Sequence, residues 1–69
     1  MEIKNEEHAK EMLENWQEKP LPAQKREIRT ALEKLELSSM YYEQKGNDKG
    51  SARSQRCIRI LSEHLRTLE

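Results

Sequence analysis

The chain has 69 residues, of which 33% are hydrophobic and 38% are charged, and its 13 basic and 13 acidic side chains give a formal net charge of zero. This length allows one domain at most, and the small apolar content predicts a thin core that needs self-association or a partner to support it. Zero net charge gives no general electrostatic reason to bind nucleic acid or a membrane surface. The charge is uneven, however, because residues 1–22 are acidic in balance and residues 45–69 are basic.

Composition excludes several kinds of site. The single cysteine, Cys57, cannot form an intrachain disulfide, and His8 and His64 are too widely separated in the sequence to complete a metal site with it. No cofactor motif is present and a thin domain has little interior for a catalytic pocket, so we predict no metal, no cofactor and no enzyme activity. Without an apolar run of roughly 20 residues or a secretory-signal pattern, and with a free thiol, we expect a cytoplasmic protein.

The first element that the sequence predicts is a short amphipathic helix over residues 5–19, preceded by a frayed segment, residues 1–4. Asn5 is a suitable N-cap, and the acidic residues that follow it complement the helix dipole. The helix should end at Lys19, because Pro20 disfavours helical geometry in the residue before it. Its apolar face is narrow and consists of Ala9, Met12, Leu13 and Trp16.

After a stiff connector, residues 19–22, the pattern predicts two longer helices over residues 22–45 and 51–68. Gly46 suits the left-handed residue that commonly ends a helix, the loop is expected over residues 46–50, and Ser51 is the expected N-cap of the last helix. A connection this short favours antiparallel packing of the helices that flank it.

Both long helices carry an apolar stripe at spacings of three and four, and the stripes mirror each other about Asp48. The stripe residues are Ile28, Ala31, Leu32, Leu35, Ser38, Ser39 and Tyr42 in one helix and Ser54, Cys57, Ile58, Leu61, His64, Leu65 and Leu68 in the other. We therefore predict an all-α fold: one domain over residues 1–69, built as an antiparallel helical hairpin plus the shorter N-terminal helix. The arrangement resembles a three-helix bundle, and we expect it to form a homodimer.

Three apolar residues, Leu37, Met40 and Tyr41, lie on the side of the 22–45 helix that faces away from the hairpin stripe. One interpretation is that the N-terminal helix covers them. The other is that they form an exposed patch that binds a second copy or a larger protein, with Trp16 as a further contact. The leading hypothesis is therefore a non-enzymatic interaction module, such as a small regulator or inhibitor.

The alternative hypothesis is nucleic-acid binding through the basic face of the last helix, which carries Arg53, Arg56, Arg59 and Arg66. The preceding helix and the turn are both too long for a helix-turn-helix motif. A simpler interpretation is a solvated face that pairs with the acidic N-terminal helix. Cys57 lies on the apolar stripe, so we expect a buried and inert thiol.

Overall fold

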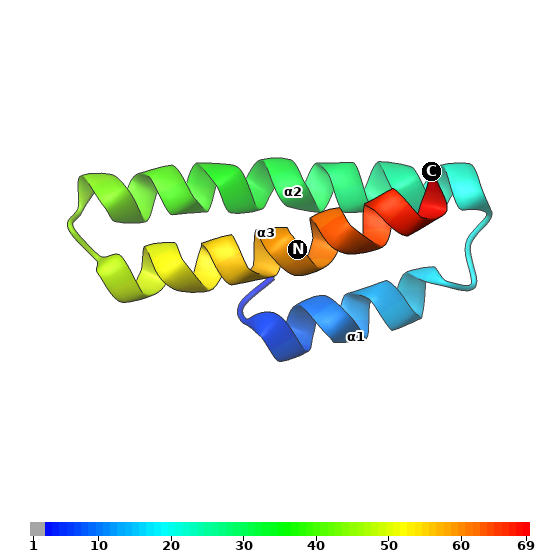
Figure 1. Ribbon diagram of the computed structural model, residues 1–69, viewed down its shortest axis with the longest axis horizontal. Helices are drawn as coiled ribbons and strands as arrows, with labels where there is room; N and C mark the ends of the chain where they lie inside the picture. Colours follow the sequence, from blue (N-terminus) through cyan, green and yellow to red (C-terminus); the bar gives the residue numbers. More distant parts are fainter. Residues whose placement is uncertain (1–2) are drawn as a thin grey trace.

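The computed structural model describes residues 3–69, and in that range it consists of three α-helices and no strand (Figure 1): α1, Glu6–Trp16; α2, Leu21–Gln44; and α3, Asp48–Leu68. Helices α2 and α3 form a long antiparallel hairpin, and α1 packs mainly on α3. The predicted all-α, three-helix architecture is confirmed, whereas the homodimer stays a prediction. None of the three helices has a stretch both long and apolar enough to cross a membrane.

The start of α1 follows the predicted chemistry, but its end does not. The Asn5 side-chain oxygen accepts a hydrogen bond from the His8 backbone N–H at 2.8 Å, which confirms Asn5 as the N-cap. The helix ends at Trp16, three residues before the predicted Lys19, and the chain then turns through a hydrogen bond from the Lys19 N–H to the Trp16 carbonyl. The turn is needed because α2 begins directly after Pro20.

The segment before α1 is docked where the structure describes it. Ile3 packs against the core, and the Lys4 backbone N–H donates to His8 Nδ1 at 3.1 Å. The expected fraying therefore does not apply to these two residues, and the rest of that expectation concerns residues 1–2, which lie outside the described residues.

The hairpin loop is shorter than predicted. It consists of residues 45–47, and Gly46 has the expected left-handed backbone with φ +71°. The predicted N-cap at Ser51 is wrong, because Asn47 accepts a hydrogen bond from the Gly50 N–H at 3.0 Å and α3 begins at Asp48. The centre of the loop is therefore Gly46 rather than the predicted pivot at Asp48.

The core lies between the two long helices and under α1. Every stripe residue predicted for α2 and α3 is buried or half-buried. One buried residue was not predicted: Gly50 lies directly beneath the ring of Tyr42, where an added Cβ would come within 2.7 Å of the ring. Nearby, Gln55 Nε2 donates to Ser39 Oγ at 2.8 Å. The buried apolar side chains are Ala9, Met12, Leu13, Trp16, Ile28, Leu35, Cys57 and Leu61.

Candidate functional site

The most prominent surface feature is an apolar patch on α2, which we call the α2 patch and define as Leu37, Met40 and Tyr41. These side chains are 67%, 56% and 56% exposed. They share one face because they are three and four residues apart on a helix. The interpretation in which the N-terminal helix covers them is wrong, because α1 lies chiefly against α3 and leaves the back of α2 open.

The aromatic member of the α2 patch is held by its neighbours. The Tyr41 ring meets the Tyr42 ring edge to face, with centroids 5.8 Å apart and planes at 68°. Lys45 Nζ lies 5.7 Å from the centroid of the Tyr41 ring, within reach of a cation–π attraction. Tyr42 is half-buried in the hairpin. The Tyr41 ring therefore contacts a neighbour that is itself held by packing between α2 and α3.

Trp16, the fourth residue predicted for the interaction surface, does not lie on the surface. It is 7% exposed and belongs to the same core as Ile28 and Leu61. Trp16 therefore anchors α1 to the chain's own hairpin. We therefore leave Trp16 out of the α2 patch.

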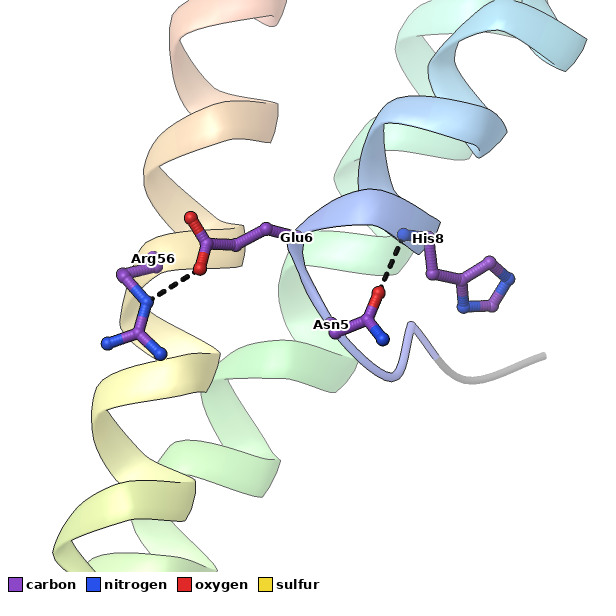
Figure 2. A network of polar contacts seen from close by, with 4 residues as sticks. All are labelled: Asn5, Glu6, His8 and Arg56. Carbon is purple, nitrogen blue, oxygen red and sulfur yellow. Dashed lines mark hydrogen bonds and ion pairs between the residues drawn. The ribbon is translucent and has the colours of Figure 1, made fainter.

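The four candidate arginines of α3 do not form one continuous, unpaired basic surface. Arg56 Nε lies 2.7 Å from Glu6 Oε1, so this guanidinium is occupied by the first turn of α1 (Figure 2). Arg53 lines a cavity between the long helices. Arg59 and Arg66 are exposed and, seven residues apart, share one face. The predicted pairing of basic α3 with the acidic N-terminal helix is confirmed at Arg56.

Cys57 is a core thiol. It is 1% exposed, and burial raises the pKa of its thiol, with a further upward contribution from the Glu6 carboxylate and opposing contributions from Arg53 and Arg56. A thiol that is both inaccessible and held in its neutral form is a poor nucleophile. This agrees with the inert role predicted from the apolar stripe.

The structure also contains a cavity that the sequence did not predict. It has a volume of about 160 Å³ and opens between α2 and α3 where the N-terminal segment crosses them. Its charged lining residues are Lys4, Lys34 and Arg53, which come from three separate segments of the chain. Arg53 belongs to the predicted basic face of the last helix, but no spacing in the sequence joins it to the two lysines.

Within residues 3–69, no three His, Cys, Asp or Glu side chains are grouped closely enough to hold a metal ion. Comparison of the chain with protein-family models, with curated proteins and with solved structures gave no match in any of the three.

Proposed function

We propose that this chain is a non-enzymatic protein-interaction module, a small regulator or inhibitor that self-associates through the α2 patch and presents the resulting dimer to a larger protein. The observation that carries the proposal is the exposure of three large apolar side chains, Leu37, Met40 and Tyr41, on one continuous helix face. Clustered exposed apolar side chains of this size usually mark an interaction site. We place the module in the cytoplasm, where a free thiol stays reduced.

A second copy of the chain fits this face because the charges around it are self-complementary. Glu33 lies four residues before Leu37, and Lys45 lies four residues after Tyr41, so the four side chains follow one line along α2 and its C-cap, Lys45. If two α2 helices pack antiparallel with Leu37 opposite Tyr41 of the second copy, Glu33 faces Lys45 of the second copy. Two-fold symmetry repeats both contacts, as a closed dimer requires.

The first test is sedimentation equilibrium at chain concentrations up to tens of micromolar. The wild-type chain should approach twice its mass of 8.2 kDa. Leu37→Glu and Tyr41→Glu should each shift the equilibrium to the monomer, because a carboxylate would be buried against apolar groups. The matched control is Leu21→Glu, which alters an exposed apolar residue of α2 outside the patch and should leave the dimer intact. A wild-type chain that stays at 8.2 kDa throughout contradicts self-association.

A charge exchange tests the antiparallel register. Glu33→Lys should weaken the dimer because it places two lysines opposite each other, and Lys45→Glu should weaken it in the same way. The double variant restores opposite charges at both symmetric contacts and should recover most of the association. If the double variant is weaker than either single variant, the helices do not pair in this register.

The binding of a larger protein is tested by affinity capture from the native host with wild-type chain and Leu37→Glu as paired baits. A partner retained by the wild type and by Leu21→Glu, but lost with Leu37→Glu, is the expected result. The same set of captured proteins with all three baits would show that the α2 patch is not the contact surface.

Nucleic-acid binding by α3 remains the competing proposal, supported by the exposure of Arg59 and Arg66. It predicts a mobility shift at low salt that falls steeply as salt rises and weakens for Arg59→Ala. The engagement of Arg56 by Glu6 removes one guanidinium from the row, which is why the protein-interaction proposal is preferred.

A further inference from the structure

The cavity between α2 and α3 is unusual in its charge. Its three charged lining residues, Lys4, Lys34 and Arg53, are all cationic, and no carboxylate lines it. The ion pairs among residues 3–69 join Arg29 to Glu69 and Arg56 to Glu6, so neither involves a cavity cation. In a chain with zero net charge, three cations with no carboxylate among the lining residues are a local concentration of positive charge.

One acidic group near the cavity wall, Glu6, is paired with an arginine outside the cavity lining. Glu6 is close enough to raise the pKa of Cys57, which also lines the cavity. The Glu6 carboxylate, however, lies 2.7 Å from Arg56 Nε, where the start of α1 meets α3 (Figure 2). Its charge is therefore already balanced by Arg56, which does not line the cavity.

The rest of the lining suits an oxyanion with a small apolar attachment. Ser38 and Ser54 supply hydroxyl groups, which can donate to anionic oxygens, and Leu35 and Ala31 supply an apolar wall. The volume of about 160 Å³ corresponds to roughly five water molecules. That is enough for one tetrahedral oxyanion and a few attached atoms.

We propose that this cavity binds a small phosphate, either inorganic or carried on a small organic group, through Lys4, Lys34 and Arg53. A phosphate is favoured over a carboxylate because its higher charge and additional oxygens can occupy three cations and two hydroxyls at once. Because Lys4 precedes α1 whereas Lys34 and Arg53 belong to the hairpin, the bound phosphate joins the N-terminal segment to both long helices. Phosphate therefore stabilises the docking of α1.

The test is a titration of the ¹⁵N-labelled chain with inorganic phosphate, and separately with methyl phosphate and acetate, at constant ionic strength maintained with chloride. Backbone amide shifts should change saturably around residues 3–4, 34–38 and 53–57, and the thermal midpoint should rise with phosphate. Acetate should bind more weakly. Tighter binding of methyl phosphate than of inorganic phosphate identifies a small phosphomonoester as the natural ligand class, and the reverse order identifies the free ion.

Two matched substitutions decide whether the cavity is responsible. Arg53→Gln should weaken phosphate binding about tenfold or more, because it removes one charge-assisted contact. Arg59→Gln removes an exposed arginine of the same helix that lies outside the cavity, and it should leave the affinity unchanged. Lys34→Gln with Arg53→Gln should abolish the saturable shifts while the helical circular dichroism is retained. Equal affinities in Arg53→Gln and Arg59→Gln, or shifts spread over all basic residues without saturation, would overturn the site.

Discussion

The half of the hairpin that α1 covers and the half next to the loop are made from the same two helices, but they are held together differently. Under α1, the space between α2 and α3 is filled by large apolar side chains such as Ile28 and Leu61, and Trp16 of α1 belongs to the same core. Towards the loop, where α1 does not reach (Figure 1), the seam consists of Ser39, Ser54 and the contact of Tyr42 with Gly50.

This difference assigns folding stability mainly to the half under α1 and the candidate binding surfaces to the half next to the loop. The covered half buries most of the apolar surface, which dominates the free energy of folding. The loop half buries small residues, so its helices can approach closely, and its outer surfaces remain available. Both the α2 patch and the cationic cavity lie in or at the edge of the loop half. The predictions below test this division.

The largest expected effect comes from truncating one leucine in each half. Leu61 is fully buried in the covered half and Leu37 is 67% exposed in the loop half. Leu61→Ala should lower the free energy of unfolding by about 2–5 kcal/mol, because it leaves a cavity in the core. Leu37→Ala should change it by less than about 0.5 kcal/mol. Urea unfolding, followed by helical circular dichroism at concentrations below self-association, measures both.

Similar losses for the two leucine variants would mean that the exposed face of the loop half contributes to folding as much as the core does. The division between a stabilising half and a recognition half would then be wrong. The Leu37→Ala experiment must use dilute chain, because loss of a dimer contact would otherwise be read as loss of monomer stability.

A smaller effect is expected at the close approach of the loop half. Gly50→Ala adds a Cβ that would lie 2.7 Å from two atoms of the Tyr42 ring, one of them the ring's first carbon, which a rotation of the ring cannot move far. We expect a loss of about 1–3 kcal/mol from overpacking. This exceeds the gain of about 1 kcal/mol that alanine offers over glycine within a helix.

A double-mutant cycle separates the two contributions to the Gly50→Ala effect. Tyr42→Leu removes the ring, so adding Gly50→Ala to that background should cost far less than in the wild type and can even stabilise α3. An equal cost of Gly50→Ala in both backgrounds would show that the glycine is not needed for the contact with Tyr42.

The amino-acid pattern predicts those parts of the fold that depend on one-sided burial. The stripes of α2 and α3 are correct because apolar residues repeat at the helical period wherever a helix is buried on one side. The predicted start of α3 is wrong because Asn47 and Ser51 are both good N-caps, and the structure uses Asn47, which places Gly50 in the first turn of α3 beneath Tyr42. That contact joins two helices, so local propensity cannot reveal it.

The candidate sites were predictable to different degrees. The α2 patch is predicted by apolar residues on the face of α2 that points away from the hairpin stripe. The pattern alone could not exclude that α1 covers them. The cavity was not predictable, because Lys4, Lys34 and Arg53 become neighbours only after the N-terminal segment crosses the hairpin. Isolated basic residues in a highly charged chain carry no signal of such convergence.

The smallest expected effect lies at the boundary of the two halves, where Glu6 joins the start of α1 to Arg56 (Figure 2). The paired side chains are 43% and 55% exposed, so Glu6→Gln should lower the free energy of unfolding by about 0.2–1 kcal/mol, less at high salt. Glu7→Gln, which changes an exposed residue of the same turn, is the matched control and should have little effect. A loss with Glu6→Gln that does not shrink with salt would argue against an exposed ion pair.

Glu6→Gln also has a measurable effect on the pKa of the Cys57 thiol. Burial raises the pKa of the thiol above 9.0, and the Glu6 charge raises it further. Because the thiol pKa is higher in the folded than in the unfolded state, the neutral thiol's contribution to the free energy of unfolding is fully present below the thiol's ordinary pKa. That contribution is lost as the pH rises through the folded-state pKa. Glu6→Gln should therefore lower the thiol pKa, seen by the ultraviolet absorbance of the thiolate, and reduce the loss of stability above pH 9.0. Because burial is the larger cause, the pKa should stay above its ordinary value in Glu6→Gln. An ordinary thiol pKa in that variant would show that the Glu6 charge, and not burial, raises the pKa.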